Sequence, residues 1–381
     1  MWIYRCLKCF IKIIVLFIII ILAIAAITAI IGINNCPAPN KVSNLTANDI
    51  AQVIPSKVRK IQSTIVNYHR PLSSTYLTFP EWYIVYSAQE YADFLKNNLP
   101  SGFPYFSSIQ QYWCGYHTVY QFTKSLPSNS GDHLMLWVIG ISFSAEYTIK
   151  GIYENTIGRL TESLSANQQT DEDKYAQKVA QEYVDFIPVR PWFEFSFANS
   201  LRGLWTETSW TGPHMIRKWE RKIILSLEYS IKATYASLIT LGSHAAYGEE
   251  SATTYAWIDN TSALLFKNNS NIHQISTINP QSYIATFPRE QPFTDTVIKL
   301  NDTELRFVDI AGNHVIMFTL ITPRDWKYSL NQGGILFTMD ILTHPSLQRV
   351  AILVPVNELI SVLSKLQQDN TIIAIEHVYD Y

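Results

Sequence analysis

The feature that most constrains this chain is an uncharged apolar run at residues 13–33, in which Thr28 is the only polar side chain. As an α-helix the run would extend about 31 Å, at about 1.5 Å per residue. That length matches the hydrocarbon core of a bilayer, about 30 Å thick. A helix also satisfies its own backbone hydrogen bonds in lipid. The run therefore predicts a transmembrane helix.

A cleaved signal peptide is the alternative interpretation of the same run. Signal sequences have apolar cores of about 7–15 residues, shorter than this one. Small residues inside the run, at Ala23, Ala25 and Ala26, nevertheless leave cleavage open.

Flanking charges predict the orientation of the span. Arg5, Lys8 and Lys12 precede it, whereas Lys41 is the only basic residue soon after it. Positive flanks stay in the cytoplasm. We therefore expect residues 1–12 to be cytoplasmic and the bulk of this single-pass membrane protein to be periplasmic or extracellular.

Composition limits the classes of partner. The net charge is −2, so nothing favours a nucleic-acid partner. Aromatic residues make up 13% of the chain and charged residues only 16%. That balance favours a packed aromatic core and a large protein or membrane contact surface. Cys36 and Cys114 follow the span, where an oxidising compartment would permit a disulfide, but the sequence leaves open whether they are bonded.

The chain beyond the span divides into three regions. Residues 34–75 are expected to form a stalk with a short helix. Residues 76–242 should form a mainly helical domain, with helix starts predicted at Thr78, at Thr170 with Asp173 as its capping partner, and near Thr211.

The helical region contains an internal repeat, which predicts a duplicated three-helix unit at residues 88–157 and 180–239. AQEYADF at residues 88–94 recurs as AQEYVDF at residues 180–186, and the same offset of 92 pairs Trp113 with Trp205. EYTIK at residues 146–150 recurs as EYSIK at residues 228–232. The alternative is a coincidence of short words.

Residues 253–381 change to short β-rich runs. The last segment reads as strand, helix and strand, with Asn357 as the helix cap and Leu359, Leu363 and Leu366 on one helix face. This pattern predicts a βαβ unit with parallel strands. The fold class expected is therefore α+β: an N-terminal transmembrane helix, a helical middle domain and a C-terminal sandwich of ferredoxin-like type.

Motifs for catalysis, metals and cofactors are missing from the sequence. It contains no phosphate-binding glycine loop, no HExxH and no GxSxG. We therefore predict no metal and no cofactor, and catalytic residues stay unknown.

Two sets of residues are candidates for ligand binding. The first lies in a tryptophan-rich segment whose polar groups stand beside rigid aromatics, which is typical of pockets, of membrane interfaces and of plain core packing. The second is the repeated pair of Glu and Lys four residues apart, which forms either surface ion pairs or a partly buried group at a symmetry axis. The two sets are Trp205, Glu207, Trp210, His214, Arg217 and Arg221, and then Glu146, Lys150, Glu228 and Lys232.

The function expected is a membrane-anchored module outside the cytoplasm that binds a partner protein, lipid or small ligand. The alternative is a tethered enzyme acting on lipid or envelope material, with Glu207, His214 and Arg217 or the Glu/Lys pairs as its working groups. A water-accessible cavity in which titratable groups converge would favour the enzyme.

Overall fold

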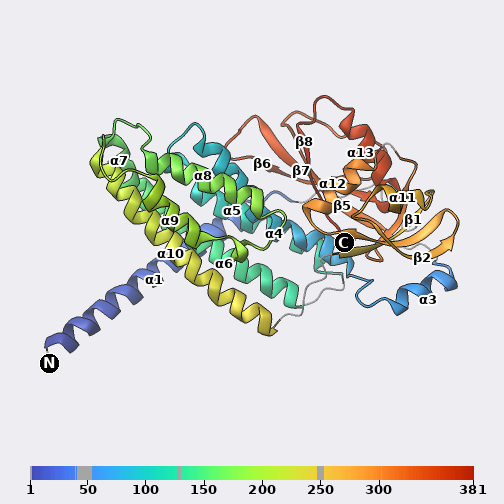
Figure 1. Ribbon diagram of the computed structural model, residues 1–381, viewed down its shortest axis with the longest axis horizontal. Helices are drawn as coiled ribbons and strands as arrows, with labels where there is room; N and C mark the ends of the chain where they lie inside the picture. Colours follow the sequence, from blue (N-terminus) through green and yellow to red (C-terminus); the bar gives the residue numbers. More distant parts are fainter. Residues whose placement is uncertain (1, 39, 41–53, 127–129, 247–252, 302) are drawn as a thin grey trace. The chain divides into compact units, whose positions relative to one another are not determined.

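The computed structural model describes residues 2–38, 40, 54–126, 130–246, 253–301 and 303–381 (Figure 1). The fold is α+β, and the described chain divides into two compact units. Unit 1 comprises residues 1–37, 80–117 and 133–242, and is helical. Unit 2 comprises residues 38–79, 118–132 and 243–381, and holds two four-stranded antiparallel sheets.

Helices account for the whole of unit 1 apart from its turns. A 3₁₀ turn follows α4 and another follows α8, and a π-helical turn, η2, continues α6 into α7. The elements are α1 (Trp2–Asn34), α4 (Leu72–Leu95), η1 (Pro100–Gly102), α5 (Tyr105–Thr123), α6 (Ser130–Tyr153), η2 (Glu154–Gly158), α7 (Arg159–Leu164), α8 (Asp171–Phe186), η3 (Trp192–Glu194), α9 (Phe197–Glu207) and α10 (Met215–Ala246).

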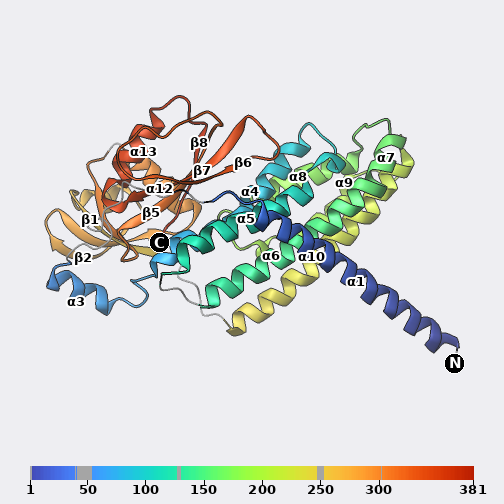
Figure 2. The same ribbon diagram turned by 180° about the vertical axis from the view of Figure 1, so that it is seen from behind.

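Helix α1 contains the apolar run that the sequence singled out. Among the residues described with their side chains, no helix meets the length and hydropathy that a membrane span requires. The N-terminal part of α1 projects from the rest of unit 1, as Figure 2 shows.

The C-terminal part of α1 packs against the bundle. Ile21, Ala25 and Ala29 are buried along one of its faces. At Gly32 the helix comes so close to α5 that an added Cβ would lie 2.4 Å from the carbonyl oxygen of Gln110. A Cys36–Cys114 disulfide then joins the chain just after α1 to α5. The pairing that the sequence left open is therefore formed.

Two of the three expected helix starts need correction. The prediction at Thr78 is wrong, because α4 begins at Leu72 and carries Pro80 inside the helix; Thr78 Oγ1 donates to the Ser74 carbonyl instead of capping. The Thr170 start is confirmed, with a capping box that includes Asp173. Near Thr211 the helix begins later, at Met215, because His214 adopts a positive φ of 57° just before it.

Both sheets of unit 2 have the same strand order. In the first, β1 (Thr253–Asp259) and β3 (Ser282–Pro288) are central, flanked by β4 (Arg306–Ile310) and β2 (His273–Asn279); in the second, β5 (Val315–Pro323) and β7 (Leu347–Pro355) are central, flanked by β8 (Ala374–Val378) and β6 (Gly334–Asp340). Each reads second, third, first, fourth along the sheet. The first sheet carries α11 (Leu264–Asn268) and α12 (Gln291–Lys299), and the second carries α13 (Leu359–Gln367).

One hydrophobic core serves both sheets. It contains Phe287 and Phe307 from the first sheet, Phe318 and Ile352 from the second, and residues of α12 and α13. The helices contact the opposite sheet reciprocally, since α12 touches β8 and α13 touches β4.

The expected C-terminal βαβ unit is correct in its element order and in the direction of its strands. Strands β7 and β8 both pair antiparallel with β5, so they run parallel to each other. They are not neighbours, however, because β5 lies between them. The predicted cap at Asn357 is also wrong, since that residue lies in the 3₁₀ turn η4 (Val356–Glu358); Leu359, Leu363 and Leu366 are buried as expected.

The segment expected as a stalk is partly packed onto unit 2. Residues 41–53 lie outside the described part, but α3 (Ser56–Thr64) and the residues after it cover the first sheet. Gln62 and Tyr68 donate hydrogen bonds of 2.7 and 2.6 Å to the two oxygens of buried Asp309. Burial raises the pKa of that carboxyl above its ordinary value.

Candidate functional site: charged clusters in the helical unit

The two segments of the sequence repeat make equivalent contacts. Each contains a helix, a 3₁₀ turn and two further helices, and η1 and η3 occupy positions that differ by 92. Trp113 Nε1 donates to Ser144 Oγ at 2.9 Å, and Trp205 Nε1 donates to Ser226 Oγ at the same distance. A large indole fixes the spacing of the helices around it. The paired bonds therefore hold corresponding helices in a similar arrangement.

Aromatic contacts repeat in the same way. Tyr91 and Phe103 meet edge-to-face at 5.0 Å between ring centroids, and Tyr183 and Phe195 do so at 5.2 Å. The Lys150 ammonium lies 5.4 Å from the Tyr91 ring centroid, and Lys232 lies 5.8 Å from that of Tyr183. The lysine–tyrosine pairs connect the first helix of each segment to its last helix, and the tyrosine–phenylalanine pairs connect the first helix to the residue after the 3₁₀ turn.

The four repeated charges form one group, which we call the Glu/Lys quartet: Glu146, Lys150, Glu228 and Lys232. Lys150 Nζ lies 3.2 Å from Glu146 and 2.8 Å from Glu228. Lys232 Nζ lies 3.0 Å from Glu146 and 3.1 Å from Glu228. Each ammonium therefore contacts a carboxylate of both α6 and α10.

Electrostatics keep the quartet charged. Burial alone would raise the pKa of the Glu228 carboxyl, but the Lys150 and Lys232 ammonium groups overcome it, so the pKa falls well below its ordinary value. Burial likewise opposes the charge of Lys150, yet the two carboxylates raise its pKa well above the usual range. Alternating charges at this spacing hold α6 and α10 together.

A second group, the buried ion-pair cluster, was not predicted as a whole. Four basic residues of α10 lie inside unit 1: Arg217, Lys218, Arg221 and Lys222, all at most 2% exposed. Their spacing places them on one face of the helix. That spacing is the signal that sequence reasoning missed, because it treated Arg217 and Arg221 as pocket residues.

Acidic residues from η2, α7 and α8 meet these bases. Arg217 contacts Glu162 at 3.3 Å and Asp173 at 2.8 Å. Arg221 contacts Glu154 at 2.8 Å. These acids are themselves buried. Charges removed from water need such partners to remain ionised.

The lysines of the cluster share Glu172. Its Oε1 lies 2.9 Å from Lys218 Nζ and 3.3 Å from Lys222 Nζ, and the carboxylate is fully buried. Lys222 also reaches Thr208 Oγ1. The basic residues of the cluster therefore find their partners within unit 1.

The remaining predicted site residues lie at separate places. Trp205, Trp210 and Trp219 form a cluster with ring centroids 5.4–6.1 Å apart, and Trp210 is exposed. Glu207 pairs with Lys178 at 2.8 Å, whereas His214 Nε2 contacts Gln168. Glu207, His214 and Arg217 thus have different partners.

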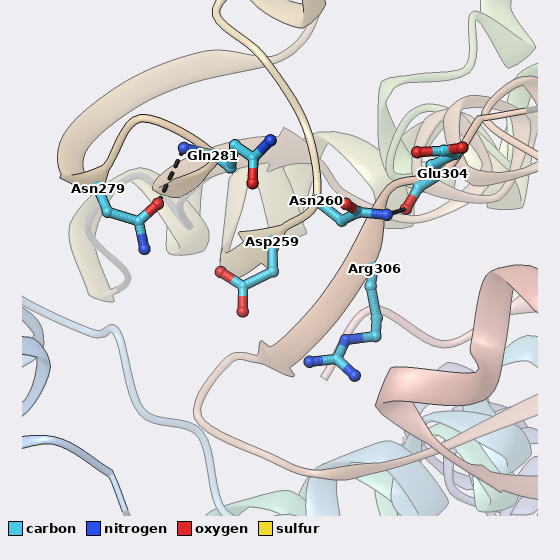
Figure 3. A pocket seen from close by; sticks show the side chains of 6 residues that line it. All are labelled: Asp259, Asn260, Asn279, Gln281, Glu304 and Arg306. Atoms are coloured by element: carbon cyan, nitrogen blue, oxygen red, sulfur yellow. Dashed lines mark hydrogen bonds between the residues drawn. The ribbon is translucent and has the colours of Figure 1, made fainter.

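A polar hollow of about 430 Å³ lies at one end of the first sheet (Figure 3). Asp259 is the last residue of β1, Asn260 follows it, and Arg306 is the first residue of β4. Asn279 and Gln281 lie at the turn between β2 and β3. None of the predicted site residues lines it. Within the described residues, no group of His, Cys, Asp and Glu has the arrangement that could hold a metal ion.

Comparisons with known proteins found no match. The sequence matches no protein-family model and no curated protein, and no solved structure matches the fold.

Proposed function

We propose that this chain is a membrane-anchored, non-catalytic binding module, single-pass through α1, with both units outside the cytoplasm. The observation that carries the proposal is the end of the anchor. Immediately after α1, Cys36 is bonded to Cys114 of α5. Structural disulfides persist in oxidising compartments and are rare in the cytosol. The bond fits an N-terminus in the cytoplasm and a bulk that is periplasmic or extracellular.

The state of the charged residues supports binding over catalysis. An anchored enzyme would need titratable groups that converge on water or substrate. Arg217 and Arg221 are instead buried in ion pairs with Asp173 and Glu154, and the quartet joins α6 to α10. We therefore assign the buried ion-pair cluster and the Glu/Lys quartet to the stability of unit 1. Binding of lipid or protein is assigned to the outer surface of unit 1.

Two architectural proposals belong with this function. The equivalent contacts of residues 88–157 and 180–239 support a duplicated three-helix unit, because its second copy repeats the Trp–Ser bond and the aromatic pairs. The shared strand order supports two ferredoxin-like units in tandem in residues 253–381, the second without its first helix.

The disulfide and the topology can be tested together in cells. The two other cysteines, Cys6 and Cys9, are first replaced by serine. A maleimide-linked polymer should then label no thiol until a reductant is added, after which Cys36 and Cys114 both react. An alkaline phosphatase fused after Tyr381 should be active, because that enzyme requires oxidising conditions outside the cytoplasm. Two freely reactive thiols together with an inactive fusion would refute the proposal.

A further inference from the structure

The outer face of α10 has the reverse polarity of a soluble surface helix. Its charged residues between Met215 and Thr240 all point inward or sideways, and the most exposed, Glu228, has a side chain only 24% exposed. Its exposed residues are uncharged, and the aliphatic ones among them, Ile216, Ile223, Leu227, Ile231 and Leu238, are each more than half exposed. Ser230, Thr234 and Ser237 are exposed as well. Helices on a water-facing surface normally show the opposite arrangement.

These aliphatic side chains form a stripe along α10, interrupted by exposed Thr234 and by Glu220, whose side chain is only 9% exposed because it pairs with Arg217. Their spacing of four and seven residues places them on a single helix face. From Ile216 to Leu238 the stripe extends about 33 Å, at about 1.5 Å per residue. Isolated exposed aliphatics need no explanation, but an extended apolar strip marks a contact surface.

Helix α6 extends the same apolar surface. It lies beside α10 through the quartet, and Figure 1 shows the two helices next to each other. Its exposed residues include Leu134, Trp137, Val138, Ile141 and Ile149. Two neighbouring helices thus pair their charged side chains with each other and expose aliphatic side chains, although the side chain of Glu146 in α6 is itself 39% exposed.

The anchor indicates what covers this surface. Helix α1 belongs to the same compact unit and packs on it through Ala25, Ala29 and Gly32, so the unit cannot drift far from the bilayer that α1 crosses. The outward side chains of α1, such as Leu16 and Ile19, are exposed aliphatics of the same kind as those of α10. An exposed tryptophan, a residue type that favours the membrane interface, belongs to this surface at Trp137 of α6.

We infer that the outer face of α6 and α10, the α6–α10 face, lies in the membrane interface, with its aliphatic side chains among the acyl chains of the leaflet outside the cytoplasm. This inference rests on the proposed membrane anchor and adds a second, peripheral contact. The free energy comes from burial of apolar area, as for amphipathic helices that lie in the plane of a bilayer. The charged side chains of α10 stay paired, and Glu146 of α6, whose side chain is 39% exposed, is paired with Lys150 and Lys232, so no unpaired charge enters lipid.

Depth-dependent quenching in vesicles tests the inference with the full chain. A fluorescent amino acid is placed at Leu227, and separately at Ile231, in protein reconstituted into phosphatidylcholine–phosphatidylglycerol vesicles that contain lipids brominated on the acyl chain. The matched control is Ile373 in unit 2, a β-branched residue that is 60% exposed, against 58% for Ile231. We expect quenching at Leu227 and Ile231 at least about threefold stronger than at Ile373, because only the former enter the acyl region.

A third probe at Ile19 of α1 distinguishes failure of the α6–α10 face from failure of the membrane anchor. Quenching at Ile19 together with control-level quenching at both Leu227 and Ile231 would overturn the α6–α10 face and leave the anchor in place. Control-level quenching at all three positions would overturn the proposed membrane anchoring as well. Probes at Leu227 that report a second copy of the chain by self-quenching, without bromine quenching, would make this face a dimer interface and refute the lipid contact.

Discussion

The shared carboxylate of Glu172 gives the most direct test of the buried ion-pair cluster. Glu172→Gln keeps the shape of the side chain and removes its charge. Lys218 and Lys222 would then lie beside a neutral amide, and their nearest remaining acid is the exposed Asp171, 3.5 Å from Lys218. An ammonium group cannot stay buried without compensation, so one lysine must either remain charged at a cost or lose its proton.

The magnitude follows from these two choices. Removing one partner of a buried ion pair costs about 3–5 kcal/mol. Deprotonating a lysine of ordinary pKa, about 10.4, at pH 7 costs about 4–5 kcal/mol, which sets a similar ceiling. We therefore expect Glu172→Gln to lower the free energy of unfolding by about 3–5 kcal/mol at pH 7.

Denaturant unfolding of the full chain in detergent micelles, followed by far-ultraviolet circular dichroism, measures this change. Glu182→Gln is the matched control, because Glu182 lies on the same helix α8, contacts Lys178 at 3.9 Å and is 52% exposed. An exposed pair of this kind is worth about 0–1 kcal/mol. Equal costs for Glu172→Gln and Glu182→Gln would refute the reasoning.

Three further predictions concern other contacts. Because burial raises the pKa of Asp309, the stability it contributes is present at low pH and is lost as pH rises through its folded pKa; Asp309→Asn should therefore gain stability relative to the parent between about pH 4 and pH 8 in parallel denaturant titrations. Replacing Cys36 and Cys114 together by Ser opens a loop with a sequence separation of 78 and should lower the unfolding free energy by about 4–5 kcal/mol, whereas Cys6→Ser with Cys9→Ser should not. Lys150→Met and Lys232→Met should cost similar amounts, about 1–3 kcal/mol, since each ammonium contacts the same two carboxylates; a cost confined to one of them would contradict their equivalence.

Each of these predictions can be contradicted by a single stability measurement. The Asp309→Asn variant should stay folded, because Gln62 Oε1, which has no hydrogen-bond partner among the described residues, can accept from the new amide if the glutamine amide flips. A variant that loses stability equally at pH 4 and pH 8 would show that the carboxyl is ionised in the folded state throughout. Loss of stability on Cys36 and Cys114 replacement that is below about 1 kcal/mol would mean that the loop is already constrained without the bond.

Local patterns in the sequence predicted the elements but not all their ends. The capping box at Thr170 was found because a local side-chain pattern determines it. The start predicted at Thr78 was wrong because a proline after a threonine resembles a first turn, whereas α4 begins at Leu72 and retains Pro80 inside the helix. At Asn357 a short 3₁₀ turn precedes the helix, and no side-chain pattern distinguishes the two.

Local patterns in the sequence could not predict long-range strand pairing. Strands β7 and β8 were recognised as parallel, but the sequence could not show that β5 lies between them, because strand order depends on the whole sheet. The Glu/Lys quartet followed from an internal repeat, which carries long-range information. The buried ion-pair cluster showed only the spacing of its bases along α10, and no repeat linked them to its acids, which come from η2, α7 and α8.

The inward position of the charges and the outward position of the aliphatics have one physical explanation. A helix that must present an apolar face to lipid has only its inner face left for polar side chains, and charged groups there must pair with one another. In α10 the inner face carries Arg217, Arg221 and Glu228, while Leu227 and Ile231 face out. If the outer face were in water, the same composition would be expected with the two faces exchanged. The proposed placement beside the bilayer would explain both the ion pairs of unit 1 and its apolar exterior.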